Sequence, residues 1–117
     1  MELARVVFDS LALGYARVVA TIERLTGAAI PGIHVVGGGS RNAYLNQATA
    51  DATGKPVLAG PVEATAAGNV IVQAVASGSL ASIAEGRAAL VRGLSLTQFE
   101  PRRSAHWAEL AARLRPA

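Results

Sequence analysis

The glycine triplet Gly37–Gly39 constrains the fold most, because a short apolar run precedes it and a helical segment follows it directly. The run Ile33–Val36 is rich in β-branched residues and follows Pro31-Gly32, a pattern that predicts a buried strand. Ser40 is a favourable N-cap, so we expect a helix over residues 41–53. The sequence therefore predicts a strand, a tight turn and a helix in immediate succession.

A second short apolar segment completes a supersecondary unit. Gly54 provides a stop for the helix, and Pro56–Ala59 predicts another strand. A strand, a helix and a strand within roughly 30 residues make a βαβ unit. The two strands of such a unit are parallel, and the crossover between them is right-handed. The predicted class is α/β, with a short parallel βαβ core.

A long amphipathic helix is predicted over residues 2–26, and Gly27 can end it. Its large apolar side chains recur at intervals of three and four, which places them on one stripe, and most charged residues fall away from that stripe. Gly14 in the middle of the helix costs about 1 kcal/mol relative to Ala, which indicates that something packs closely there. The stripe consists of Leu3, Val7, Leu11, Tyr15, Val18, Ile22 and Leu25.

The second half of the chain is predicted to be mostly helical. One helix is expected from near Val62 to Ala76. Ser82 and Glu85 form a capping box that opens another helix, which continues to about Arg92. Residues 94–101 are expected to be an extended linker. The last helix has the apolar stripe Trp107, Leu110, Ala111 and Leu114.

Composition narrows the classes of function. The 117 residues are 51% hydrophobic but only 4% aromatic, so there are few aromatic platforms for stacking bases or sugars. The net charge of +3 comes from scattered basic residues, without the basic run that nucleic-acid binding uses. The lack of cysteine excludes disulfides and suits a reducing, cytoplasmic compartment. We expect neither a nucleic-acid partner nor a membrane span.

The glycine turn is the strongest candidate for a ligand site. Gly37, Gly38 and Gly39 let a ligand approach the backbone without a Cβ in the way, and the helix start after them presents N–H groups that suit a phosphate. Asn42 carries an amide in the first helical turn that could hydrogen-bond a base or a ribose. The chain lacks the Lys-Ser or Lys-Thr of a P-loop, and Asn42 stands where a dinucleotide fingerprint needs glycine. A tight turn without a ligand is the alternative.

Other polar side chains fit structural roles better. Asp9 is expected on a solvated helix face, and Asp51 is expected to make local hydrogen bonds near a helix end. Glu63 suits the first turn of its helix, with shaping of the nucleotide pocket as the alternative. His34 and His106 are not spaced as a metal pair. We assign no catalytic residue and no metal ligand to this chain.

The glycine turn and the segments after it resemble the C-terminal signature of the FGGY family of carbohydrate kinases. The resemblance extends from the first helix through Phe99-Glu100-Pro101, and it is greatest to the branch of the family that acts on rhamnulose. Its specific parts are Gly37-Gly38-Gly39-Ser40-Arg41-Asn42, Leu45-Asn46-Gln47, the segment 50–57 and the segment 60–69.

This resemblance implies a fold, a cofactor and site residues. Residues 1–117 would be part of the C-terminal, nucleotide-binding-side domain of an actin/hexokinase-like (ribonuclease H-like) fold. ATP would be the cofactor, with Mg²⁺ bound through its phosphates and not by this chain. Gly37, Gly38 and Gly39 would contact the phosphate side of ATP, and Asn42 would contact the adenosine. A hydroxyl of a sugar, rhamnulose, would accept the phosphoryl group.

The resemblance also implies that much of the enzyme lies outside these residues. The family's sugar-binding N-terminal domain, its catalytic aspartate and its other phosphate-binding loops would precede residue 1, so this chain would not catalyse alone. The competing interpretation is a non-catalytic interaction module. Unpaired strand edges and apolar surface would invite self-association or a protein partner.

Overall fold

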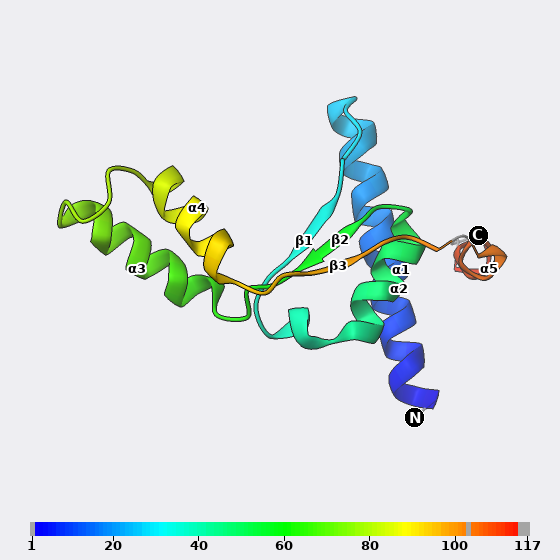
Figure 1. Cartoon of the computed structure of the whole chain (residues 1–117). Helices are drawn as coiled ribbons and strands as arrows, with labels where there is room; N and C mark the ends of the chain where they lie inside the picture. Colours follow the sequence, from blue (N-terminus) through cyan, green and yellow to red (C-terminus); the bar gives the residue numbers. More distant parts are fainter. Residues whose placement is uncertain (1, 103, 115–117) are drawn as a thin grey trace.

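The computed structural model describes residues 2–102 and 104–114 (Figure 1). Within these residues, none of the helices has both the length and the apolar character that crossing a membrane requires. The fold is helix-rich α/β, as predicted. In chain order the elements are α1 (Glu2–Thr26), β1 (Ile33–Val35), the 3₁₀ helix η1 (Gly38–Arg41), α2 (Ala43–Thr53), β2 (Val57–Ala59), α3 (Ala64–Ala76), α4 (Ile83–Gly93), β3 (Thr97–Phe99) and α5 (Ala105–Arg113).

The strands form a mixed sheet in the order β1-β2-β3. β1 is parallel to β2, with Ile33 opposite Val57, which confirms the predicted βαβ unit and makes α2 its crossover helix. β3 adds an antiparallel edge to β2, with Phe99 opposite Val57. Residues 94–101 were expected to be an extended linker, and this is wrong for Thr97–Phe99, which form β3. The three residues of β3 are mostly exposed and carry no apolar alternation, so the pattern that reveals a strand is missing.

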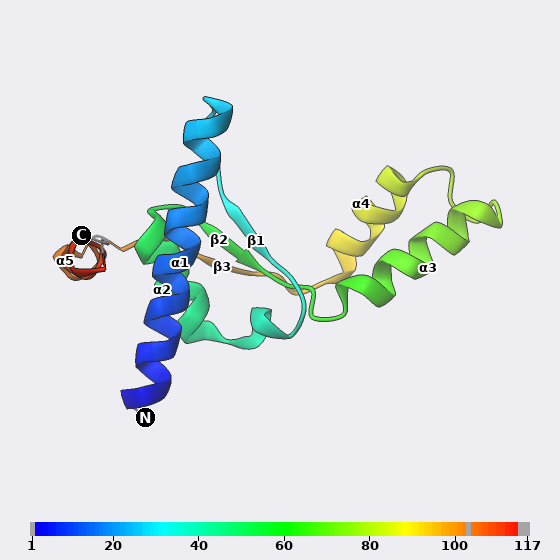
Figure 2. The same ribbon diagram turned by 180° about the vertical axis from the view of Figure 1, so that it is seen from behind.

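α2 lies between α1 and the sheet, packing against both (Figures 1 and 2). Gly54 ends α2 in the left-handed conformation, with φ of +68°, as its position in the sequence predicted. The side chains buried in this layer are mostly small, so the three elements approach closely but enclose little apolar volume. The buried apolar residues of α1, α2 and β2 are Ala12, Leu13, Ala48, Ala50, Val57 and Ala59.

The face of α1 that packs is not the predicted apolar stripe. All seven stripe residues are exposed, from 40% for Leu11 to 78% for Leu3. Ala12 and Leu13, which are buried, lie on roughly the opposite side of the helix, given a step of about 100° per residue. Apart from the neighbouring backbone of α1, no atom of the described residues lies within 4 Å of the position that a Cβ on Gly14 would occupy. The close packing expected at Gly14 is therefore also absent from this structure.

α3 and α4 form a hairpin that projects from the end of the sheet, away from α1 and α2 (Figures 1 and 2). Gly86 allows the two helices to meet, because a Cβ on it would lie 2.5 Å from Cγ2 of Ile71. The predicted capping box opens α4. The Ser82 hydroxyl accepts a hydrogen bond from the N–H of Glu85, and the Glu85 carboxylate accepts one from the N–H of Ala81.

The molecule is less compact than a chain of this length usually is. Its radius of gyration is 17.1 Å, whereas about 13 Å is expected for 117 residues. Its accessible surface is 8067 Å², against about 5,900 Å² for a folded monomer of 11.9 kDa. Much of this surface remains uncovered, and it includes large apolar side chains such as Leu3, Val70 and Leu25.

Candidate functional site

The glycine turn leaves β1 and is fixed at its first residue. Gly37 has φ of +81° and ψ of −164°, a region that is open essentially only to glycine. Its N–H donates to the carbonyl oxygen of Pro61 at 3.0 Å. Its own carbonyl oxygen accepts from the backbone N–H of Ser40 at 3.0 Å and from the Ser40 hydroxyl at 2.7 Å. Gly37 therefore anchors the turn against the chain that leaves β2.

Gly38 and Gly39 form the open part of the turn. Both are exposed, and beyond the adjoining backbone no described residue has an atom within 4 Å of the positions that their Cβ atoms would occupy. Among the residues that the structure describes, nothing accepts a hydrogen bond from either N–H group. Free backbone N–H groups at the start of a helical segment attract anions. The turn thus presents an accessible pair of donors.

Asn42 is the N-cap of α2 and lies before its first turn. Its Oδ1 accepts from the N–H of Leu45 at 3.0 Å. The prediction of Ser40 as the N-cap is therefore wrong. η1 intervenes, the Ser40 hydroxyl bonds Gly37, and α2 begins at Ala43. The Nδ2 group of Asn42 has no acceptor in the part of the chain that the structure describes, so this end of the amide is available to a ligand.

A cleft of about 720 Å³ opens beside the turn. One side is formed by residues directly after the glycines. The rest is formed by the end of β2, the segment that joins it to α3, one face of α3, the segment that joins α4 to β3, and β3 itself. Gly37, Gly38, Gly39 and Asn42 do not themselves line the cleft, although Gly37 lies against the carbonyl of Val62, which does. The lining residues nearest the turn are Ser40, Arg41, Ala43, Pro61, Val62 and Glu63.

Some residues of the cleft were not assigned from the sequence. Arg41 brings a positive charge to the edge of the cleft. Its position directly after the glycine triplet is the sequence feature that could have indicated this. Ser95, Thr97 and Phe99 reach the cleft because β3 joins the sheet, and that pairing was not predicted. Glu63 also lines the cleft, at the N-cap position of α3 and without a capping hydrogen bond from its side chain. Glu63 therefore stands just before the first turn of α3, where it was expected, and its alternative role in shaping a nucleotide pocket stays a prediction.

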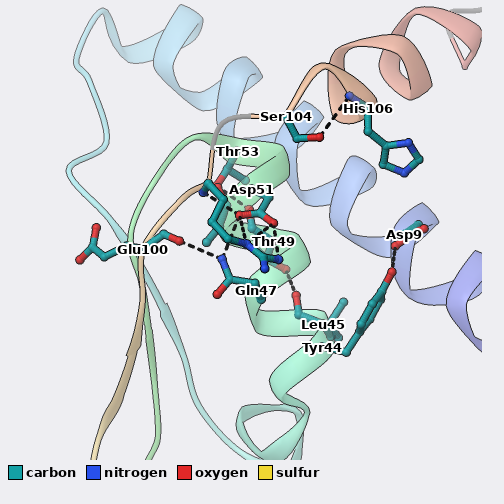
Figure 3. Close-up of polar contacts among 12 residues, drawn as sticks. Asp9, Tyr44, Leu45, Gln47, Thr49, Asp51, Thr53, Glu100, Ser104 and His106 are labelled. Atoms are coloured by element: carbon teal, nitrogen blue, oxygen red, sulfur yellow. Dashed lines mark hydrogen bonds and ion pairs between the residues drawn. The ribbon is translucent and has the colours of Figure 1, made fainter.

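Asp51 lies away from this cleft, in a polar network that joins α2 to the segment after β3 (Figure 3). Its side chain is 6% exposed and accepts from the backbone N–H of Arg102 at 2.8 Å, from the Arg102 guanidinium at 2.9 Å and from Gln47 at 2.9 Å. Burial alone would raise the pKa of Asp51, but the hydrogen bonds from Arg102 and Gln47 outweigh it and lower the pKa. The expected hydrogen-bonding role is confirmed, with a partner distant in sequence.

Asp9 is not on a solvated helix face. Its side chain is 16% exposed, and it accepts a hydrogen bond of 2.7 Å from the Tyr44 hydroxyl (Figure 3). Burial and this hydrogen bond raise the pKa of Tyr44. The prediction for Asp9 failed because the residue faces α2 and not the solvent. The two histidines make structural contacts, His34 with the carbonyl of Gly60 and His106 with the ring of Trp107.

Comparison with known proteins identifies the family to which this chain belongs. The model of the FGGY family of carbohydrate kinases, C-terminal domain, matches residues 1–77. The chain therefore belongs to the FGGY family of carbohydrate kinases, which confirms the resemblance seen in the sequence.

Several rhamnulokinases are similar to this chain. The chain is 45% identical to the rhamnulokinase of Pectobacterium carotovorum subsp. carotovorum over 98% of its length. It is 44% identical to that of Bacteroides thetaiotaomicron over 91% of its length, and 41% identical to that of Bacillus subtilis over 86%. The chain spans only 24%, 22% and 21% of these relatives, respectively.

Proposed function

We propose that this chain forms the adenosine-side wall of the ATP cleft in an FGGY-type carbohydrate kinase, and that the phosphoryl acceptor is a hydroxyl of rhamnulose. The observation that carries the proposal is the open glycine turn, with two free backbone N–H groups, beside a cleft of about 720 Å³. Membership of the family supports the class of reaction. The names of the relatives support the sugar.

Each proposed site residue has a role that its surroundings permit. The N–H groups of Gly38 and Gly39 would donate to the phosphates of ATP, and Gly37 would hold the turn in its glycine-only conformation. The Nδ2 group of Asn42 would donate to the adenosine. Arg41, at the edge of the cleft, would add positive charge on the phosphate side. Mg²⁺ would be held through the phosphates.

The contribution of these residues would be positioning and charge stabilisation. In phosphoryl transfer most of the catalysis comes from these two effects. ATP supplies the phosphoryl group when it is bound, and the residues that act on the sugar belong to other parts of the enzyme. On this proposal the chain works in the cytoplasm as one part of a larger kinase and is not active alone.

A second function has one observation in its favour. The seven exposed apolar residues of α1 would suit a non-catalytic interaction or self-associating module derived from a kinase domain. Such a module would need neither the free N–H groups of the turn nor the cleft beside it. The two functions therefore predict different results for substitutions in the glycine turn. Only the first predicts that such substitutions weaken ATP binding.

A chimeric enzyme tests the proposal. The matching segment of the Pectobacterium carotovorum rhamnulokinase is replaced by this chain, and ATP-dependent phosphorylation of rhamnulose is measured. We expect activity, and we expect Gly39→Val to raise the KM for ATP about tenfold, a loss of about 1.4 kcal/mol, with little change in the KM for the sugar. Ala112→Val, on the exposed surface of α5, is the control. An active chimera whose KM for ATP is insensitive to Gly39→Val would contradict the proposed site.

A further inference from the structure

Helix α1 has buried apolar residues on one side and an exposed apolar stripe on roughly the opposite side. Ala12 and Leu13 are buried on the side that packs against α2. The stripe on the other side runs the length of the helix, from Leu3 to Leu25, and every residue of it is exposed. A surface helix normally has a polar face opposite its packed face, whereas a helix that is apolar on all sides is usually buried.

The stripe carries no charge. At about 100° per residue, the small residues Ala4 and Gly14 fall within it, and the charged side chains of α1 all fall outside it. Two of these charged groups, Asp9 and Glu23, are engaged on the packed side, Asp9 with Tyr44 and Glu23 with Lys55. The charged residues of the helix are Glu2, Arg5, Asp9, Arg17, Glu23 and Arg24. The solvent-exposed side of α1 is therefore its least polar side.

The uncovered area is large enough for a permanent interface. The accessible surface of 8067 Å² exceeds the expectation for a monomer of this mass by about 2,000 Å². Obligate interfaces bury about 2,000–5,000 Å² over both partners, or about half of that on each. The excess over the whole chain, to which the α1 stripe contributes, is therefore of the size that such an interface covers.

We propose that the α1 stripe is the docking surface for the part of an FGGY kinase that this chain does not include. The chain corresponds to 24% of the Pectobacterium enzyme while 98% of its own residues are aligned. In such a relative the counterpart of α1 lies within one much longer polypeptide. The rest of that polypeptide, about three quarters of its length, is the partner that we propose for the stripe.

A second copy of this chain fits the surface less well. Two copies paired through α1 would leave the exposed apolar residues of the α3–α4 hairpin uncovered, because that hairpin projects from the opposite end of the molecule (Figure 2). These residues are Val70, Val72, Ile83 and Val91. A single larger partner can cover both regions.

The test co-expresses the full chain, tagged, with the Pectobacterium rhamnulokinase from which the matching segment has been deleted, and purifies through the tag without nucleotide. We expect a one-to-one complex in sedimentation analysis.

We expect Val18→Lys, on the stripe, to reduce recovery of the partner about tenfold, equivalent to about 1.4 kcal/mol. Val6→Lys is the matched control, because Val6 lies off the stripe yet is 59% exposed, close to the 57% of Val18. It should retain recovery.

Circular dichroism of both variants checks that α1 is intact, which we expect because Lys is at least as good a helix former as Val. The proposal is overturned if no complex forms or if both variants bind equally. It is also overturned if the chain alone sediments as a dimer that Val18→Lys dissociates, since the stripe would then serve a second copy. Complex formation is measured without ATP. A complex that forms but does not bind ATP would therefore contradict the proposed function and leave the docking proposal intact.

Discussion

The three glycines of the turn make different contributions, which their backbone conformations and surroundings define. Gly37 has a φ of +81° that side chains strongly disfavour, and it makes the hydrogen bonds that shape the turn. Gly38 and Gly39 have ordinary backbone angles and open space around them. At the residue scale, the first glycine is needed for structure, and the other two are needed only if something approaches the backbone.

Substitution by alanine separates these contributions. We expect Gly37→Ala to lower the free energy of unfolding by about 1–3 kcal/mol, the cost of a side chain in this region of backbone space. Gly39→Ala should leave stability unchanged or raise it by up to about 1 kcal/mol, because alanine restricts the unfolded chain more than glycine does. Urea unfolding followed by circular dichroism measures both. Equal losses for the two variants would show that the turn is not held as described.

At the scale of elements, a single buried carboxylate joins segments that are far apart in sequence. Asp51 of α2 receives hydrogen bonds from Arg102, just before α5, and Gln47 of α2 donates to the carbonyl of Glu100 (Figure 3). These contacts hold the chain after β3 against α2. Because the pKa of Asp51 is lowered in the folded state, its contribution to stability depends on pH.

Asp51→Asn tests this connection. A folded-state pKa below the ordinary value means that the contribution is fully present above about pH 4 and is lost as the pH falls through the lowered pKa. We expect the variant to be less stable by about 1.5–3 kcal/mol at pH 7, the range for hydrogen bonds to a charged group, and the difference to shrink below pH 4. Urea unfolding at pH 7 and at low pH measures it. A difference that is the same at both, or that also appears in the exposed control Glu109→Gln, would refute this role.

The elements that the sequence predicted are those with local signals. Ser82 and Glu85 mark a helix start, Gly54 marks a helix end, and the run Ile33–Val36 followed by glycines marks a strand and a turn. β3 could not be predicted, because its three residues gain their strand conformation from pairing with β2. For the same reason the contribution of Ser95 and Phe99 to the cleft was not foreseen.

The α1 stripe shows a different limit. The spacing of Leu11, Tyr15 and Val18 correctly predicts a helix with an apolar face, but the pattern does not say what covers that face. In this structure α2 covers the opposite side, where small residues such as Ala12 allow closer approach. Ser40 was mistaken for the N-cap because the sequence gives no sign that η1 would precede α2.

At the scale of the whole molecule, the described residues make a small core, and two apolar surfaces lie outside it, on α1 and on the α3–α4 hairpin. The principal extents of 56 × 37 × 22 Å describe an elongated body in which the α3–α4 hairpin lies at one end and α1, α2 and α5 lie toward the other (Figure 1). The cleft lies between these ends, next to the glycine turn. An open cleft with exposed apolar surfaces on either side of it is what the proposed function requires of one part of a larger kinase.

The central claim is that the glycine turn and Asn42 receive a nucleotide. The most direct measurement follows the backbone amide signals of Gly38 and Gly39, and the side-chain amide signal of Asn42, by NMR as MgATP is added to the chain into the millimolar range. We expect these three signals to shift progressively and without saturating early, because on the proposed function much of the pocket would be supplied by other parts of the kinase. The signals of Gly27 and Gly54, at the ends of α1 and α2, should stay in place. If the three signals do not move, or if the shifts cluster elsewhere, the assignment of ATP to this turn is contradicted.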